Sequence, residues 1–109
     1  MLTWTDAPGP TYTTYTPNGR FLITVGNNNV IRVFTTGSDD EPVNIDVPQE
    51  SHTAVAATNR FFVTGAEDGT VCKYSMTTNT LDEILLRSTL PIRDVALSPD
   101  GLWVAVASE

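Results

Sequence analysis

Two stretches of the chain repeat one pattern of hydrophobic and polar positions. Phe21–Phe34 lies over Phe61–Tyr74 at an offset of 40 residues, without a gap. Each stretch reads as an apolar strand, a short polar turn, and a second alternating strand that ends in an aromatic side chain. Two such strands joined by a short polar turn are typical of a β-hairpin, so we expect the same hairpin twice.

A third copy of the pattern begins near the end of the sequence. Ser98–Ala107 matches Thr16–Val25 at an offset of 82 residues. Both copies contain a turn triplet, Pro17-Asn18-Gly19 in one and Pro99-Asp100-Gly101 in the other. Proline presets φ for a turn, Asn or Asp bonds back to the backbone, and glycine supplies a positive φ. Each triplet is therefore predicted to join two antiparallel strands.

The repeat predicts short strands along the whole chain. One segment is ambiguous, because the apolar spacing in Leu81–Leu86 also fits a helical turn. We interpret it as a strand since the repeat requires one there. The predicted strands are Tyr12–Thr16, Phe21–Val25, Val30–Phe34, Asn44–Val47, Thr53–Ala57, Phe61–Thr64, Val71–Ser75, Leu81–Leu86, Arg93–Leu97 and Trp103–Ala107.

Four short strands per period of about 40 residues are typical of the blade of a β-propeller. The predicted fold is therefore all-β, a propeller fragment of about two and a half four-stranded antiparallel blades. We expect blade 1 at about 11–47, blade 2 at about 52–86 and the start of blade 3 at about 92–109. A blade cannot bury both faces alone, and an unpaired strand edge invites pairing with other chains. We therefore interpret the chain as a fragment of a longer gene product.

Composition and charge favour protein partners over nucleic acids or membranes. The chain of 109 residues is 40% hydrophobic and 17% charged, which is typical of a globular protein. Its formal net charge is −7, Lys73 is the sole lysine, and the arginines are scattered singly. Binding to phosphates or acidic lipids requires clustered basic residues, so we do not expect this segment to bind either directly. Cys72 is the sole cysteine, which excludes an internal disulfide.

The second unit resembles the WD40 pattern. In that pattern a histidine before the first strand is followed by a strand-two Ser or Thr, an Asp-Gly turn and a terminal aromatic residue. The corresponding residues here are His52, Thr64, Asp68 and Tyr74. The resemblance implies a WD40-type propeller in which these side chains form a buried hydrogen-bonded network, with the aspartate orienting the histidine. Each bond of such a network contributes about 1 kcal/mol.

Taken from the residues alone, His52 has three interpretations: a structural histidine, a solvated loop histidine, and a metal ligand or general base. No second histidine accompanies it, and one histidine with one cysteine does not make a zinc site. Asp68 is a turn residue first and a site carboxylate second. The sequence has no glycine-rich phosphate loop, nucleophile elbow or paired carboxylates. We therefore predict no enzymatic activity, catalytic residue, metal or cofactor.

An acidic loop made of Asp39, Asp40 and Glu41 lies between the third and fourth predicted strands. The simplest interpretation is a solvated connector. The alternative is an interaction loop that contacts a basic segment of a partner protein.

Two stretches resemble one particular propeller family. Gly37–Asp46 resembles the acidic, proline-containing connector after the first blade of that family, and Leu85–Val95 resembles the segment leading to its third blade. The family comprises the replisome adaptors that link DNA polymerase α–primase to the replicative helicase. They are called chromosome-transmission-fidelity or acidic nucleoplasmic DNA-binding proteins, with SepB and minichromosome-loss proteins among the fungal members. The likeness runs from about Thr13 to Glu109.

The resemblance implies a non-catalytic scaffold in the nucleus that acts in DNA replication and sister-chromatid cohesion. Its implied partners are proteins, namely DNA polymerase α–primase and subunits of the replicative helicase. In that family a second, central propeller forms homotrimers and captures short helical peptides. That part is absent here, so no trimer or peptide-binding residue is carried over. The alternative is a WD40 scaffold unrelated to replication, which recruits substrates to a ubiquitin ligase or serves a trafficking coat.

Overall fold

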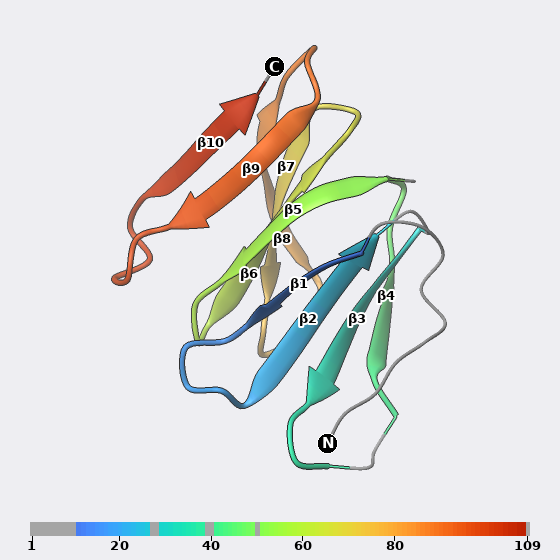
Figure 1. Cartoon of the computed structure of the whole chain (residues 1–109), viewed down its shortest axis with the longest axis vertical. Helices are drawn as coiled ribbons and strands as arrows, with labels where there is room; N and C mark the ends of the chain where they lie inside the picture. The colour runs from blue at the N-terminus through green and yellow to red at the C-terminus, as the bar shows by residue number, and fades with distance from the viewer. Residues whose placement is uncertain (1–10, 27–28, 39–40, 50, 109) are drawn as a thin grey trace.

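Short β-strands make up the regular structure of the chain (Figure 1). The computed structural model describes residues 11–26, 29–38, 41–49 and 51–108. Those ranges contain no helix, and so no helical segment capable of spanning a lipid bilayer. The strands are β1 (Thr11–Tyr15), β2 (Phe21–Gly26), β3 (Val30–Thr35), β4 (Val43–Asp46), β5 (His52–Ala57), β6 (Phe61–Ala66), β7 (Thr70–Ser75), β8 (Leu81–Arg87), β9 (Ile92–Leu97) and β10 (Val104–Ser108).

The strands form three antiparallel sheets that follow one another along the molecule (Figure 1). The first sheet has the order β1-β2-β3-β4, the second has the order β5-β6-β7-β8, and the third pairs β9 with β10. The innermost strand of each sheet lies near that of its neighbour, since β5 contacts both β1 and β9. The predicted fold is confirmed: the chain is an all-β propeller fragment with two complete four-stranded sheets and half of a third.

The ambiguous segment at Leu81–Leu86 is extended, not helical. It forms β8, whose ladder with β7 runs from the Thr70–Arg87 pair to the Tyr74–Leu81 pair. The other strands lie where the repeat predicted them, with small shifts at their ends. The largest is in β6, which continues to Ala66 because that residue still pairs with His52 on β5.

The two turn triplets have matching backbone geometry. The Gly19 amide donates to the Thr16 carbonyl at 2.8 Å, and the Gly101 amide donates to the Ser98 carbonyl at 2.9 Å. Both glycines have a positive φ, 71° for Gly19 and 74° for Gly101. A side chain at either position would be strained, which explains why the turn uses glycine. The triplets join β1 to β2 and β9 to β10, as predicted.

The hydrophobic core lies between successive sheets. Alternate residues of a strand point to opposite faces, so the second sheet packs one face against the first sheet and the other against the third. Ile23 and Ile31 face the second sheet, while the equivalent Val63 and Val71 face the third. The buried residues of the first interface are Ile23, Val25, Ile31, Val33, Val47, Phe62, Cys72 and Tyr74. Those of the second are Ala54, Val63, Val71, Ile92 and Val95.

Polar contacts also tie each sheet to the next. The Asn18 amide in the first sheet donates to Asn59 Oδ1 in the second at 2.9 Å. The Thr53 hydroxyl on β5 donates to the Ile92 carbonyl on β9. Each contact links a turn or inner strand to its neighbour, so the relative placement of the sheets rests on directed bonds as well as on apolar packing.

Candidate functional site

His52 begins β5 and is completely buried next to Ala66 of β6. Neither ring nitrogen has a well-directed hydrogen bond to any of the described residues. Burial lowers the pKa of the imidazole, while the nearby Gly26 backbone and the Asp68 carboxylate partly oppose that shift. The ring is therefore neutral at pH 7. Such burial does not fit a solvated loop histidine.

Asp68 lies in the exposed turn between β6 and β7. Its Oδ1 accepts a hydrogen bond from the Thr70 amide at 3.0 Å and another from the Thr70 hydroxyl at 2.6 Å. These bonds fix the carboxylate in the turn. The negative charge of Asp68 raises the pKa of the His52 imidazole, but the two side chains are not joined by a hydrogen bond.

Thr64 on β6 and Tyr74 on β7 are both buried in the second sheet. Tyr74 stacks on Phe62 with the ring centroids 5.1 Å apart, and burial raises the pKa of its hydroxyl to about 12. The structure thus places His52, Thr64 and Tyr74 inside the sheet and Asp68 in its turn. The hydrogen-bonded network of these four residues stays a prediction.

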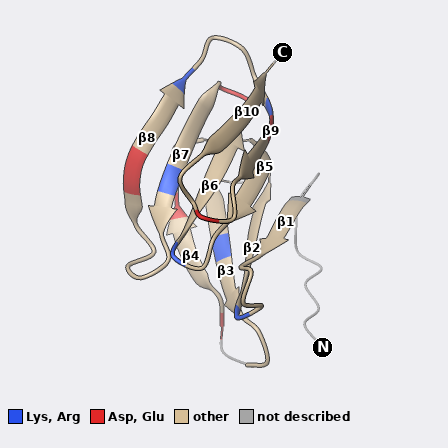
Figure 2. Ribbon diagram, turned by 90° about the vertical axis from the view of Figure 1, so that its left-hand side faces the viewer, with Lys and Arg blue, Asp and Glu red and all other residues tan. Residues whose placement is uncertain are grey.

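The acidic loop lies partly outside the described residues. Asp39 and Asp40 are not among them, and Glu41 is exposed ahead of β4. Elsewhere, charged residues of both signs are dispersed over the sheets (Figure 2). Lys73 on β7 pairs with Asp82 on β8 at 3.5 Å and stands 4.5 Å from the ring centroid of Phe61. The role of the acidic loop as a partner contact stays a prediction.

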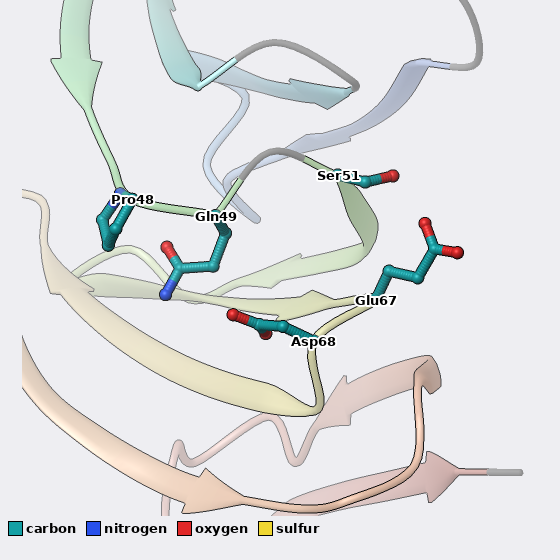
Figure 3. A pocket seen from close by; sticks show the side chains of 5 residues that line it. All are labelled: Pro48, Gln49, Ser51, Glu67 and Asp68. Atoms are coloured by element: carbon teal, nitrogen blue, oxygen red, sulfur yellow. The ribbon is translucent and has the colours of Figure 1, made fainter.

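A hollow of about 420 Å³ opens between the loop before β5 and the turn after β6 (Figure 3). The loop forms one wall and the turn forms the other. A backbone hydrogen bond of 2.9 Å, from the Glu67 amide to the Ser51 carbonyl, joins the two walls. The lining residues are Pro48, Gln49, Ser51, Glu67 and Asp68.

Gln49 is the buried member of this lining, with 9% of its surface exposed. Its Nε2 donates a weak bond to Cys72 Sγ at 3.9 Å. Its Oε1 is buried and has no hydrogen-bond partner among the described residues. Figure 3 shows the Asp68 carboxylate turned toward the Gln49 amide, while the Glu67 carboxylate lies on the side of Ser51. The lining therefore offers mainly oxygen acceptors, and it contains no lysine or arginine.

Metal-ligating side chains do not gather in the part of the chain that the structure describes, where no group of three His, Cys, Asp or Glu residues could hold an ion. Cys72 is buried, and burial raises the pKa of its thiol. The thiol is therefore protonated at neutral pH, whereas a metal ligand or nucleophile would have to be a thiolate.

The sequence did not predict the hollow, because its residues belong to no motif. Pro48, Gln49 and Ser51 come from the connector between two repeat units, and Glu67 precedes the predicted turn residue Asp68. Only the order of the strands in a blade could have indicated the hollow. A connector that leads into the first strand of a blade has to pass the turn between the second and third strands of that blade.

Comparison with known proteins identifies relatives of this chain. Minichromosome loss protein 1 of Schizosaccharomyces pombe is 50% identical over 101 residues, which cover 93% of this chain and 12% of that protein. The chain belongs to the same family. The resemblance to the replisome adaptors with their minichromosome-loss members is thereby confirmed. No protein-family model matches the chain.

Two vertebrate relatives in this replisome-adaptor family are more distant. WD repeat and HMG-box DNA-binding protein 1 is 28% identical to the chain in Xenopus laevis and 25% identical in Homo sapiens, over 100 residues in each case. The match covers 92% of this chain and 9% of each relative. The chain thus spans only about a tenth of the length of the family members that it matches. The names of these relatives describe WD repeats, HMG-box DNA binding and minichromosome loss.

Proposed function

We propose that this chain is part of a non-catalytic protein-interaction scaffold in the nucleus, which couples DNA polymerase α–primase to the replicative helicase in DNA replication and sister-chromatid cohesion. The observation that carries the proposal is the 50% identity to minichromosome loss protein 1 over 101 residues. WD-repeat relatives imply binding to other proteins, and a net charge of −7 does not favour direct contact with nucleic acid.

The architecture supports a scaffolding role. The polar residues that resemble the WD40 network lie inside or beside the second sheet, where they serve packing and turn formation. Many residues of the described loops and turns are exposed at the ends of the sheets, and loops positioned by a rigid framework commonly carry binding sites. We infer that the three sheets are successive blades of one ring, with blades at 11–47 and 52–86 and a third that starts at 92.

Co-purification tests this proposal. The full-length protein, tagged and recovered from nuclear extract after nuclease treatment, is expected to bring with it subunits of DNA polymerase α–primase and of the replicative helicase. The nuclease removes partners that are bridged only by DNA. Recovery of ubiquitin-ligase or vesicle-coat subunits, without polymerase or helicase subunits, would contradict the proposal. A variant that lacks residues 11–108 shows how much of the recovery depends on this segment.

A further inference from the structure

We propose that the outer end of the interface between the first and second sheets is a docking surface for a basic segment of a partner protein, in which apolar side chains accompany lysine or arginine. We call this surface the outer rim. It consists of Val43 and Ile45 on β4 and of Leu81 and Ile84 on β8. The inference deepens the proposed scaffold function and rests on it, because it gives the partner of the scaffold a chemical class.

Two apolar side chains of β4 project toward the second sheet. Val43 is paired with Val33 across the β3–β4 ladder, and Ile45 is paired with Ile31. Directly paired residues of antiparallel strands project from the same face of their sheet. Val33 and Ile31 both belong to the buried core between the first and second sheets. The side chains of Val43 and Ile45 therefore face the same interface.

Two apolar side chains of β8 project toward the first sheet. Leu81 is paired with Tyr74 across the β7–β8 ladder, and Ile84 is paired with Cys72. Tyr74 and Cys72 belong to the same buried core as the partners of the β4 residues. The outer strands of the two sheets thus present apolar side chains to one interface from both sides.

This outer end of the interface remains open. Val43 is 45% exposed, Leu81 is 49% exposed and Ile84 is 37% exposed. The inner strands β1 and β2 lie against β5, whereas β4 and β8 have no comparable contact in the described part of the chain. Figure 2 shows β4 and β8 on the side of the molecule away from β1. An apolar surface that two complete sheets leave uncovered is typical of a protein-interaction site.

The charge beside the outer rim gives the chemistry of the partner. Glu41 is exposed directly ahead of β4 and ends the run of three acidic residues in the sequence. The whole stretch from position 33 to position 59 contains no lysine or arginine. A segment that docks here is therefore complementary in charge if it is basic. The acidic residues of that stretch are Asp39, Asp40, Glu41, Asp46 and Glu50.

Basic residues of the adjoining strands do not neutralise this charge. Lys73 on β7 lies over the ring of Phe61, which belongs to the second interface, and pairs with Asp82. Arg32 on β3 alternates with core residues of the first interface, so it projects from the opposite face of that sheet. Arg87 stands at the end of β8 that is farthest from Leu81.

Other occupants fit the outer rim less well. A second copy of this chain brings a formal net charge of −7 and has no cluster of basic residues to place beside Glu41. Nucleic acid is repelled by the same acidic residues and offers no aliphatic side chains to the four apolar residues. A basic protein segment with apolar side chains satisfies both the charge and the exposed apolar surface.

Site-specific photo-cross-linking of the full-length protein tests the docking surface. The probe is p-benzoylphenylalanine in place of Val43, irradiated in nuclear extract after nuclease treatment, and mass spectrometry identifies the cross-linked peptide. We expect a segment of another protein with more basic than acidic residues beside apolar side chains, and a yield that falls as the salt concentration rises. No cross-link, or a cross-link to an acidic segment, to a second copy or to another part of the same chain, would overturn the proposal.

A pair of apolar substitutions locates the contact. Leu81→Ser is expected to lower the cross-linking yield about threefold or more, because it removes apolar surface from the outer rim. Leu90→Ser is the matched control, since Leu90 is 48% exposed but lies in the connector between β8 and β9. Both residues are exposed, so both variants should fold. Equal losses in the two variants would refute the outer rim as the contact.

A pair of charge substitutions tests the class of partner. Glu41→Gln is expected to lower the yield about twofold to fivefold, as for the loss of an exposed ion pair. Glu83→Gln should leave it unchanged, because Glu83 is paired with Lys73 and projects from the opposite face of the second sheet. An unchanged yield in Glu41→Gln would contradict a basic partner. Failure of these tests leaves polymerase co-purification intact, whereas failure of the scaffold proposal removes that co-purification, so the two failures are distinguishable.

Discussion

At the scale of single residues, the buried polar atoms concentrate near the start of the second sheet. Among the described residues, Gln49 Oε1 and both nitrogens of His52 are buried without a hydrogen-bond partner, and they lie three positions apart in the chain. Each unsatisfied buried group costs about 1–3 kcal/mol. This end of the sheet is therefore held by its surroundings in spite of these local polar losses.

His52 makes the stability of the segment dependent on pH. Its pKa is lowered by burial in the folded state, so the unfolded chain binds a proton that the folded chain does not. The stability it contributes is fully present above the unfolded pKa of about 6.5 and is lost as the pH falls from there toward the folded value. We expect a slope of at most about 1.4 kcal/mol per pH unit in that window.

Hydrogen exchange of peptides from β5 and β6, measured in the full-length protein between pH 7.5 and 5.5, checks this expectation after correction for the intrinsic exchange rate. His52→Gln is the matched variant, because it is polar but cannot titrate. The slope should disappear in this variant. An equal slope in both proteins would show that other groups carry the pH dependence.

The sequence was informative about which residues occupy the site and less so about how they bond. The resemblance to the WD40 pattern implied a buried His52 just before the strand, and the ring is buried, although the strand itself begins one residue earlier, at His52. The bond between His52 and Asp68 could not be tested from spacing, because it depends on the rotamers of both side chains and on the path of the turn. Gln49 was missed altogether, since nothing in its sequence neighbourhood distinguishes it from a solvated connector residue.

At the scale of the strands, the alternation of apolar and polar residues predicted the elements well, because it depends only on neighbouring positions in the sequence. A strand shows its buried face every second residue, and the repeat indicated a strand even in the ambiguous segment Leu81–Leu86. The same alternation could not predict where the pairing of two strands shifts register. The ladder of β7 with β8 shifts register after Val71 and again after Lys73, and that of β5 with β6 shifts after His52. Bulges of this kind depend on how the strands pack against neighbouring strands, which the pattern of apolar and polar residues does not specify.

Close packing between strands of different sheets depends on one glycine. A Cβ at Gly65 on β6 would overlap the side chain of Ile92 on β9, with the backbone in an ordinary conformation. Val25 occupies the equivalent position in the first sheet and is buried there against different neighbours. The second interface is therefore tighter at this point than the first, and Gly65 is what allows Ile92 to be completely buried.

Gly65→Ala should accordingly destabilise the interface between β6 and β9 by about 1–3 kcal/mol, because the added methyl group forces a shift in a packed core. The measurement is the local unfolding free energy from hydrogen exchange of peptides that span β6 and β9. In an Ile92→Ala background the same substitution should cost much less, since the colliding methyl group is gone. An equal cost in both backgrounds would mean that the strain arises elsewhere.

At the scale of the whole molecule, the repeat itself distinguishes two kinds of exposed residue on the third sheet. Leu102 is 77% exposed and Trp103 is 74% exposed. In the complete sheets, the positions equivalent to Leu102 are held by the exposed Arg20 and Arg60. The positions equivalent to Trp103 are held by phenylalanines that pack against the following sheet, Phe21 at the first interface and Phe61 at the second.

If the sheets are successive blades of one ring, a further sheet covers Trp103 in the full-length protein and leaves Leu102 in solvent. Trp103→Ser should then destabilise β9 and β10 by about 3 kcal/mol or more, as expected for the loss of a buried aromatic side chain. Leu102→Ser should change their stability by no more than about 0.5 kcal/mol, as expected at an exposed site. Hydrogen exchange of β9 and β10 peptides in the two variants provides the comparison. Because the residues are adjacent and almost equally exposed in this segment, only coverage by another blade predicts such different outcomes, and two small, equal effects would mean that no sheet packs on this face.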